Sequence, residues 1–386
     1  MLEKGHHGVR LDREAWDRLA TWIDLNVPCH GTWSQVLPVP FDGIRRRREL
    51  LRLYANFDDD FEVVPEMPRA PITPVKPAPA PVEKQAIACP GWPFDIQEAR
   101  ERQRAIAAQT ERWIDLGNGA RLKLVLVPGG EFVMGDPDGE ADERPPARVR
   151  IDEPFWMGAL EVTNAQYRLF SPQHDSGYIN QLNTNLIARG HPVNQPDQPV
   201  VRVSWEQALQ FCRWLSQKTG EAFTLPTEAQ WEWACRAGTA TPLYYGGVQT
   251  RFQQWANMAD SSLKQFAEEA RIRGKLYAIQ PDWMLRVDAV FDGALVTTRA
   301  GSYLPNAWGL HDMHGNAGEW TRSGYKPYPY REESESAAQE GDKVVRGGSW
   351  YDRPHRCRSA FRWRYPGWQR VYNVGFRVIS PARGWP

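Results

Sequence analysis

The 386-residue chain has neither an excess of charge nor a long apolar run. Lysine plus arginine and aspartate plus glutamate both number 47, so the charge balance gives no reason to expect a nucleic acid or an anionic membrane as partner. No apolar run reaches the length of a membrane span. The opening MLEKGHHGVRLDREAW has no apolar stretch behind its charges and is unlike a secretory signal, and the compartment stays open.

Several motifs of common enzyme classes are missing as well. The sequence has no phosphate-binding glycine loop, no H-E-x-x-H, no C-x-x-C and no G-x-S-x-G. Cysteine is scarce, and its number, five, is odd. At least one thiol therefore stays free or pairs between chains.

Tryptophan, glycine and proline are abundant instead. The 18 Trp residues bring large buried areas, each with one N–H that needs a partner. The 31 Gly and 31 Pro indicate many turns, which argues against a helical bundle or a doubly wound sheet. We therefore expect a loop-rich chain whose irregular backbone is held by aromatic side chains.

The composition divides the chain into four parts. Residues 66–85, which include EMPRAPITPVKPAPAPVEK, lack periodicity and are typical of an extended, semi-rigid linker. They separate a short helical N-terminal segment, 1–65, from a polar helical bridge, 86–112, and a main domain, 113–386. The N-terminal segment is too small to form a convincing core alone.

The main domain begins with strand-like patterns and continues with three short helices. RLKLVLVPGGEFVMG, at 121–135, alternates apolar and polar residues on both sides of Pro-Gly-Gly, which predicts a hairpin. Capping boxes predict helix starts at Thr163–Gln166, Ser204–Gln207 and Thr227–Gln230. Gly220 is expected to end the second helix.

The block PNAWGLHDMHGNAGEW, at 305–320, concentrates oxygen donors. An aspartate, two turn glycines, an asparagine and a glutamate lie within eight residues. Backbone carbonyls and carboxylates in such a loop can surround one hard cation, since calcium takes six to eight oxygen ligands in flexible geometry. A hydrogen-bonded turn with no ion explains the same spacing equally well, and both interpretations stay open.

The order of motifs resembles one enzyme family. PGGEFVMG, EVTNAQY, PVVRVSWEQALQFCRWL, LPTEAQWEWACRAGT, NAWGLHDMHGNAGEW, RGGSW and NVGFRV follow the order seen in the formylglycine-generating-enzyme family, also called the sulfatase-modifying-factor family. The resemblance covers residues 113–380. It implies an α+β fold, a variant of the C-type-lectin-like fold, with bound calcium. Separately, WIDLNVPCHGTW within residues 1–60 resembles the tail of hydrazine-synthase-alpha-like chains, which would make this chain the C-terminal part of a longer polypeptide.

The family's two calcium sites can be transferred by position. The first site would consist of Asn257, Met258, Asp292 and Ala294. The second site would consist of Asp312, Gly315, Ala317 and Glu319. Extra residues separate the two halves of the first site.

The catalytic position departs from the family pattern. The resemblance implies a Cys-x4-Cys pair after the G-G-S motif, which binds copper and activates oxygen; soft thiolates suit Cu(I). Ser349 matches the active-site serine, but Asp352 stands at the position of the first cysteine. We therefore expect no copper site. A family branch that uses iron needs histidines from an additional helical domain, which this chain lacks, so we do not expect iron either.

Cys357 can be aligned in two ways. Counting forward from Ser349, it falls on the second catalytic cysteine. Counting backward from Gly375, the stretch is about three residues short, and Cys357 lies two residues before a structural cysteine that the family pairs with the cysteine matched by Cys235. We favour the backward count and expect Cys235 and Cys357 to be neighbours, bonded or reduced. An inert buried thiol and a reactive thiol in a basic setting are the alternatives.

Three functions are compatible with this pattern. The missing cysteine pair favours a non-catalytic binding or accessory module with a protein, peptide or glycan ligand. A divergent metal-dependent oxidoreductase and a recognition protein with a variable loop at 350–373 are the alternatives. The candidate ligand surface, unless these side chains only cover the core, consists of Trp350, Tyr351, Arg353, His355, Arg362, Trp363 and Trp368, beside Asp352. The many arginines of this end are expected to be structural, or else to form an anion or glycan site.

Overall fold

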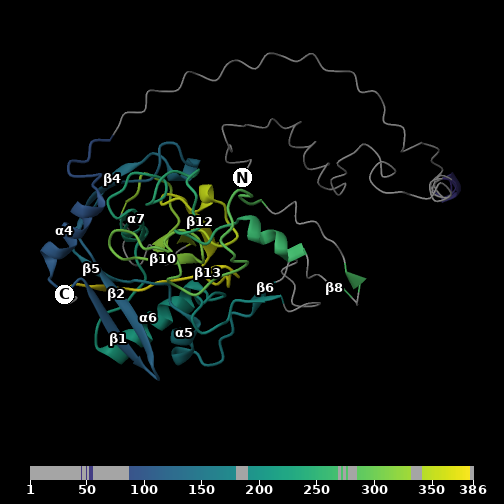
Figure 1. Cartoon of the computed structure of the whole chain (residues 1–386), viewed down its shortest axis with the longest axis horizontal. Coiled ribbons are helices and arrows are strands. Elements are labelled where there is room, and N and C mark those ends of the chain that lie inside the picture. Colours follow the sequence, from purple (N-terminus) through teal and green to yellow (C-terminus); the bar gives the residue numbers. More distant parts are fainter. Residues whose placement is uncertain are drawn as a thin grey trace, which may run out of the picture. The chain divides into compact units, whose positions relative to one another are not determined.

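The computed structural model describes residues 45, 49, 52–54, 87–179, 190–267, 271–272, 275–276, 285–331 and 341–382. The chain divides into two units, Met1–Lys84 and Gln85–Pro386 (Figure 1). In the first unit the described residues are helical. The rest of the expected N-terminal segment 1–65, with its likeness to hydrazine-synthase chains, and the linker 66–85 lie outside the described residues.

Two four-stranded sheets form the framework of the second unit. The first has the order β1 (Glu111–Gly117), β2 (Ala120–Val127), β5 (Phe155–Gly158) and β14 (Ile379–Pro381), and all its neighbours are antiparallel. Strand β14 lies near the end of the sequence, yet it pairs with β5. The first sheet therefore joins the beginning and the end of the domain.

The second sheet carries the motif-rich segments of the C-terminal third. Its order is β12 (Trp363–Pro366), β11 (Asp342–Arg346), β10 (Gly318–Gly324) and β13 (Val374–Gly375). Strands β10 and β13 are parallel, whereas β11 is antiparallel to both of its neighbours. This arrangement brings the oxygen-rich loop before β10 next to the G-G-S loop after β11, since Gly315 N donates to Gly347 O at 2.9 Å.

The expected hairpin at 121–135 is wrong. Strand β2 pairs with β1 and β5, whereas β3 (Gly130–Met134) pairs with β4 (Ala147–Ile151) in a separate two-stranded sheet. The Pro-Gly-Gly turn connects one sheet to the other, and its backbone packs closely against neighbouring atoms. A Cβ atom on Gly130 would lie 2.8 Å from the Trp233 ring. The other two-stranded sheets are β6 (Tyr178–Ile179) with β7 (His191–Pro192), and β8 (Arg271–Ile272) with β9 (Lys275–Leu276).

The three capping boxes are confirmed. Helices α5 (Asn164–Phe170), α6 (Trp205–Thr219) and α7 (Glu228–Arg236) each begin after a Thr or Ser whose side chain accepts from the backbone N–H three residues on. Gly220 ends α6 in the left-handed region, with a φ of 74°. The 3-10 helices are η3 (Ala141–Glu143), η4 (Ser261–Ala267) and η6 (Pro354–Arg356).

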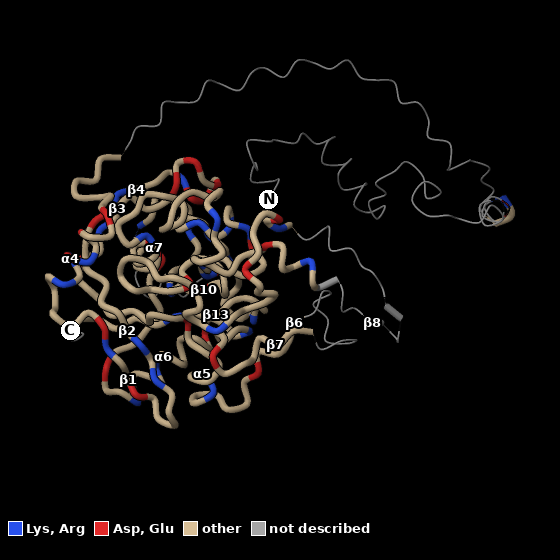
Figure 2. The backbone as a smooth tube through the Cα atoms, viewed as in Figure 1, with Lys and Arg blue, Asp and Glu red and all other residues tan. Residues whose placement is uncertain are grey.

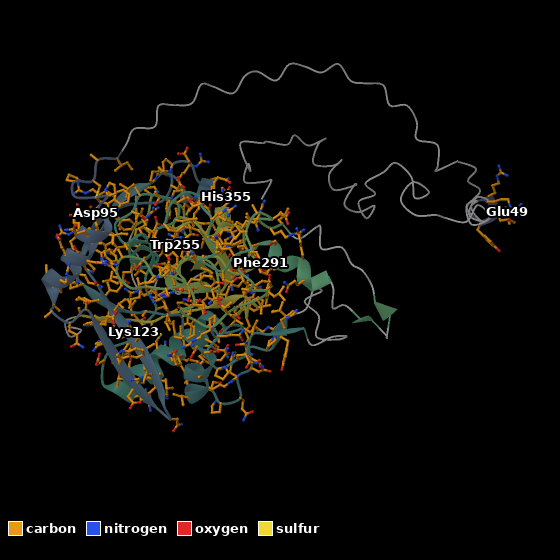
Figure 3. The ribbon with its side chains drawn as sticks, viewed as in Figure 1. Glu49, Asp95, Lys123, Trp255, Phe291 and His355 are labelled. Carbon is orange, nitrogen blue, oxygen red and sulfur yellow. The ribbon has the colours of Figure 1, made fainter. Side chains whose placement is uncertain are left out.

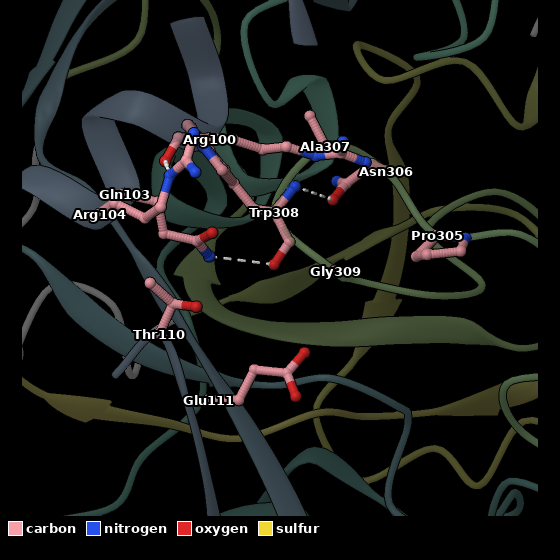
Figure 4. Close-up of a pocket in the computed structure, with 10 residues that line it drawn as sticks. All are labelled: Arg100, Gln103, Arg104, Thr110, Glu111, Pro305, Asn306, Ala307, Trp308 and Gly309. Atoms are coloured by element: carbon pink, nitrogen blue, oxygen red, sulfur yellow. Dashed lines mark hydrogen bonds between the residues drawn. The ribbon is translucent and has the colours of Figure 1, made fainter. Parts of the chain in front are cut away.

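Helix α4 (Ile96–Ile106) forms in the expected bridge and packs on the domain. Trp308 Nε1 donates to Ala99 O at 3.0 Å, and Gln103 Nε2 donates to Leu126 O at 2.7 Å and to Trp308 O at 3.1 Å. A cavity of about 290 Å³ lies between α4 and the segment 305–309 (Figure 4). The bridge is thus fastened to the domain by hydrogen bonds to buried backbone groups.

The core consists of aromatic clusters around the helices. One cluster surrounds α7 and includes Trp231, Trp233 and Trp308 at 0–1% exposure. A second surrounds α6 and includes Phe211 and Trp320, both 0% exposed. The indole N–H groups of these tryptophans find buried acceptors; Trp233 donates to Pro128 O and Trp320 to Val203 O. No helix among the described residues is long and apolar enough to cross a membrane.

Candidate functional site

Ser349 and Asp352 lie in a tight loop that follows β11. Gly347 and Gly348 precede them with φ values of 90° and 68°, in the left-handed region. Ser349 Oγ donates to Asp352 Oδ2 at 2.7 Å, and Ser349 N donates to the same oxygen at 3.1 Å. Asn373 Nδ2 in turn donates to Ser349 Oγ at 2.8 Å. The carboxylate is therefore integrated in a local hydrogen-bond network.

The side chain of Asp352 is almost completely shielded from solvent. The residue is 7% exposed, and burial raises the pKa of its carboxyl, whereas Ser349 and Arg356 act to lower it. A carboxylate in this position is a hard oxygen donor, and Cu(I) prefers soft sulfur. The first position of the family's thiol pair therefore cannot take part in thiol–copper chemistry.

Cys357 lies beside Asp352 but does not face solvent. Its Sγ is 3.7 Å from Asp352 O, and the side chain is 0% exposed. A Cβ atom on Gly348 would lie 2.5 Å from this sulfur, so only glycine leaves it room. Burial, followed by the nearby Asp352 carboxylate, raises the pKa of the thiol well above its ordinary value. These features are typical of an inert buried thiol.

No disulfide joins Cys235 and Cys357, although both contact the ring of His314. Both residues are free cysteines, and the hydrogen-bonding neighbour of Cys235 is Ser359, with Sγ and Oγ 3.5 Å apart. The His314 ring also contacts Cys235, at 3.7 Å from Nε2, while its Nδ1 lies 2.7 Å from Cys357 O. Cys357 instead packs in a cluster with Phe252.

The structure is consistent with both alignments of this loop, the forward count from Ser349 and the backward count from Gly375. Cys357 lies next to Asp352, as the forward count requires, and Ser359 lies next to Cys235, where the family's structural cysteine belongs. The missing residues therefore fall between Cys357 and Ser359.

We expect the Cys357 thiol to resist alkylation in the native protein. Its raised pKa and full burial leave almost no accessible thiolate, so iodoacetamide should label it at least about 10-fold more slowly in the folded chain than in the unfolded chain. Peptide mass spectrometry after labelling with and without denaturant measures the ratio for each cysteine. Equal labelling rates in the two states would show that the thiol is accessible and reactive.

Two of the seven expected ligand-surface residues belong to the core. Trp350 is 2% exposed and packs with Tyr351 and Tyr372. Arg362 is 6% exposed and forms a two-pronged ion pair with Glu228, at 2.5 Å from Nε and 3.0 Å from Nη2. A buried ring and a paired guanidinium cannot contact an external ligand, so these two assignments are wrong.

The other five expected residues reach the surface to different degrees. Trp368 is 74% exposed, and Arg353 and His355 are also exposed, whereas Tyr351 and Trp363 are half-buried. His355 is labelled in Figure 3. Its Nε2 lies 3.2 Å from Glu140 Oε1.

A cluster around Asp352 combines two of the expected residues, Tyr351 and Trp363, with three that the sequence analysis did not name. We call it the aromatic face and define it as Tyr351, Arg356, Trp363, Tyr365 and Tyr372. Trp363 and Tyr365 stack at 6.5 Å between ring centroids, with the Arg356 guanidinium 5.2 Å from the Trp363 ring. Burial, and then the Asp352 carboxylate, raises the pKa of all three tyrosines. The alternation of WRYP in β12 could have pointed to Tyr365, because Trp363 and Tyr365 share one side of the strand.

Four of the nine arginines of the C-terminal end have the structural role expected for them. Arg346, Arg358, Arg362 and Arg377 are 0–6% exposed, and each pairs with a buried carboxylate. In Figure 2 blue and red segments mingle within the second unit rather than separating into faces of one sign. Buried guanidinium groups of this kind donate bidentate hydrogen bonds to carboxylates and further hydrogen bonds to backbone carbonyls.

The structure brings together the two halves of the first expected calcium site. Asp292 N donates to Asp260 Oδ2, two residues after Met258, and Asn257 Nδ2 donates to Val296 O at 2.9 Å. Asn257 Oδ1 is buried without a hydrogen-bond partner. Burial, together with the neighbouring Asp260 carboxylate, raises the pKa of Asp292 to about 7. The Asp292 oxygens, however, accept from Ala294 N at 2.8 Å and Tyr303 Oη at 3.1 Å, so this site fits a hard cation only in part.

The second expected calcium site fits only in part. Asp312 is 1% exposed, and its Oδ1 has no hydrogen-bond partner. Both oxygens of Glu319, however, already accept hydrogen bonds. Arg377 donates to each of them, and Trp231 Nε1 donates to Oε2 at 2.7 Å. Gly315 and Ala317, the expected carbonyl donors, lie in the same loop. In the described part of the chain no three His, Cys, Asp or Glu side chains form a complete metal-binding group.

Comparison with known proteins gives the family of the chain. The family description "Sulfatase-modifying factor enzyme 1-like domain" matches residues 118–382. The formylglycine-generating enzyme of Bos taurus is 27% identical over 311 residues, covering 67% of this chain and 74% of that protein. The inactive C-alpha-formylglycine-generating enzyme 2 of Bos taurus is 28% identical over 316 residues, covering 70% and 92%.

Solved structures show the same fold. The variable protein 1 of Treponema denticola superposes with a TM-score of 0.54 and 19% identity over 71% of this chain and 99% of that chain. PvdO from Pseudomonas aeruginosa gives a TM-score of 0.52 and 24% identity over 71% and 100%. The fold is thus an α+β, C-type-lectin-like variant of the formylglycine-generating-enzyme type. The chain belongs to the sulfatase-modifying factor family.

Proposed function

We propose that this chain is a binding or accessory module that keeps the formylglycine-generating-enzyme fold without its copper–thiol chemistry. The observation that carries the proposal is Asp352, a buried carboxylate bonded to Ser349 where the family has its first catalytic thiol. The remaining thiol, Cys357, is buried and held in its protonated form. Oxygen activation by a pair of thiolates on copper has no equivalent here.

Relatives support a non-catalytic role. Some relatives of similar identity carry the description "inactive", including those of Bos taurus and Mus musculus, at 28% and 27%. A family that contains inactive members has retained this fold for purposes other than catalysis. Function is a property of the site rather than of the fold, and this site has exchanged a thiol for a carboxylate.

The ligand would contact the aromatic face around Asp352. Half-buried aromatic rings with one guanidinium stacked on them offer flat apolar area and hydrogen-bonding edges, which suit a peptide, a protein loop or a glycan. Calcium forms part of the same proposal. It would be held at the first site by Asn257 and Asp292 and would brace the loops behind the aromatic face.

We expect Asp352→Cys to create a Cu(I) site that the native chain does not have. The substitution supplies a second thiol at Cys-x4-Cys spacing, and Cys357 Sγ already lies 3.7 Å from the Asp352 backbone. Affinity for Cu(I) should rise at least about 100-fold, because soft thiolates in pairs are good Cu(I) ligands. Anaerobic competition with a colorimetric Cu(I) chelator measures the change.

Asp352→Asn is the matched control, because it removes the carboxylate without adding sulfur, and it should bind Cu(I) as weakly as the native chain. The native chain should also consume no oxygen and form no aldehyde on a cysteine-containing peptide, with copper or with iron. Oxygen consumption that depends on a metal would overturn the proposal and support a divergent oxidoreductase.

A further inference from the structure

The cavity between α4 and the segment 305–309 lies apart from the aromatic face and shares no described residue with it (Figure 4). Its volume of about 290 Å³ is close to the lower end of the range for small-molecule sites. Six of its ten lining residues have polar or charged side chains. A small polar ligand therefore suits this cavity better than an apolar one.

Two arginines of α4 line the cavity one helical turn apart. Arg100 and Arg104 are both exposed, and like charges four residues apart on a helix repel each other. Within the described ranges neither guanidinium has a carboxylate partner. Arg102 of the same helix, by contrast, pairs with Glu98 at 2.6 Å. The helix thus presents two uncompensated positive charges to one cavity.

The dipole of α4 accounts for one of these charges at most. Arg104 lies in the last turn, where a cation is favoured by the carbonyl end of the helix, and its Nε donates to Arg100 O at 3.2 Å. No described residue accepts from the Nη groups of Arg104, so they can bind a ligand. Arg100 lies in the middle of the helix, where the dipole gives no such advantage. Its position at the cavity needs another explanation.

The one carboxylate among the lining residues does not offset the arginines. Glu111 Oε2 lies 2.9 Å from Lys123 Nζ, so its charge is already paired. Thr110 beside it is held by its backbone, because Leu126 N donates to Thr110 O at 2.9 Å. Its hydroxyl group adds a donor that carries no charge. The lining therefore has two free positive charges and an additional hydrogen-bond donor.

The wall opposite the arginines is held by hydrogen bonds within the protein. Gln103 Nε2 donates to Leu126 O at 2.7 Å and to Trp308 O at 3.1 Å. Asn306 Nδ2 donates to Ala234 O at 2.7 Å, and Asn306 Oδ1 accepts from Trp308 N at 3.1 Å. Figure 4 shows the bonds of Gln103 and Asn306 with Trp308. The cavity is therefore formed before a ligand arrives, and binding mainly has to order the two arginine side chains.

We propose that this cavity binds the phosphoryl group of a small phosphate monoester. The guanidinium groups of Arg100 and Arg104 would donate to the phosphoryl oxygens, and the Thr110 hydroxyl would donate a further hydrogen bond. A dianionic phosphoryl group balances both positive charges, whereas a single carboxylate would leave one of them. The rest of the cavity takes the organic part of the ester. Helix α4 lies outside the residues that match the family, 118–382, so the proposal goes beyond the proposed function and is independent of Asp352.

The test titrates the full chain with inorganic phosphate and with phenyl phosphate by isothermal calorimetry at low ionic strength. Arg100→Gln and Arg104→Gln should each lower the affinity at least about 10-fold, because each removes charge-assisted hydrogen bonds to the phosphoryl oxygens. Arg102→Gln is the matched control: it removes the same charge from the same helix, but Arg102 does not line the cavity. Its affinity should stay within about 3-fold of the native value, since exposed charges outside the site are screened.

Each alternative predicts a different outcome. Equal losses in Arg100→Gln, Arg104→Gln and Arg102→Gln would show a general effect of positive charge and overturn the proposal. The absence of binding of both probes up to about 10 mM overturns it as well. Phenyl phosphate should bind at least about 3-fold more tightly than inorganic phosphate, because its ring buries apolar area in the cavity. Equal or weaker binding of phenyl phosphate would contradict the assignment to a monoester.

A structural measurement on the native chain does not depend on the folding of any variant. Crystals soaked in tungstate, a heavy tetrahedral dianion, should show an anomalous peak in contact with the guanidinium groups of Arg100 and Arg104. A peak that contacts neither arginine, or no peak in this cavity, would contradict the site.

Discussion

Ser359→Cys is expected to form a disulfide with Cys235 and to raise the free energy of unfolding by about 3 kcal/mol. Ser359 Oγ lies 3.5 Å from Cys235 Sγ, and both side chains are 0% exposed. The new bond would close a loop of 124 residues, for which the loss of chain entropy in the unfolded state sets a limit of roughly 5 kcal/mol. We expect less than the limit because the two sulfurs have to approach to roughly 2 Å.

Denaturant unfolding with and without a reductant measures this effect. The oxidised variant should unfold at a higher denaturant concentration than the native chain, and reductant should abolish the difference. Thiol titration of the denatured, non-reduced protein should give one thiol fewer than in the native chain. Cys235→Ala in the same background is the matched control. Identical midpoints with and without reductant would show that the two side chains do not come within bonding distance.

The second large effect is expected for Arg346→Met, with a loss of about 3–5 kcal/mol in the free energy of unfolding. Arg346 is 0% exposed, and its Nη2 donates to Glu232 Oε2 while Nε lies 3.1 Å from Glu228 Oε1. Its Nη1 also donates to Ser359 O at 2.7 Å and to Phe361 O at 3.1 Å. Methionine has a similar volume but no charge, so the buried carboxylates of Glu228 and Glu232 lose the cation that Arg346 supplied.

Arg364→Met is the matched control for this substitution. Arg364 comes from the adjacent strand, is exposed, and lies 3.9 Å from Asp342 Oδ2. Surface pairs of this kind contribute at most about 1 kcal/mol, so its loss should cost little. Chemical denaturation of both variants gives the comparison, and equal losses would contradict a special role for the buried guanidinium.

The Arg346→Met effect should depend on pH in a defined direction. Burial acts to raise the pKa of Glu232, but Arg236 and Arg346 together hold it below its ordinary value. In the native chain Glu232 therefore contributes stability that is present above its unfolded pKa and is lost as pH falls through the folded pKa. Without Arg346 the folded pKa rises, so the cost of the substitution should be largest at neutral pH and should shrink below about pH 5.

Local sequence rules predicted the helices of this domain well. Thr163, Ser204 and Thr227 begin helices with complete capping boxes, and Gly220 ends one, because capping involves atoms only a few residues apart. The α+β class and the family followed from the order of motifs. The absence of the thiol pair was also visible in the sequence. Asp352 stands three residues after Ser349, at the position where the family has its first thiol.

Contacts between segments that are far apart in the sequence could not be predicted from such local rules. The alternating pattern around Pro128 suggested a hairpin, but nothing local indicates that β3 pairs with β4 across a crowded glycine turn. Trp350 and Arg362 were expected on the surface because aromatic and arginine side chains suit ligands. Their burial depends on Tyr372 and Glu228, which lie 22 and 134 residues away.

The sequence by itself thus determined the fold class, the family, the starts of three helices and the loss of the catalytic thiol pair, all of which depend on residue identity at fixed spacing. Only the tertiary structure decided which atoms meet. It showed that Cys235 faces Ser359, that Cys357 lies beside Asp352, and that Glu319 is committed to Arg377. The physical reason is that a pairing is fixed by three-dimensional packing and competition for hydrogen-bond partners. A linear spacing specifies neither.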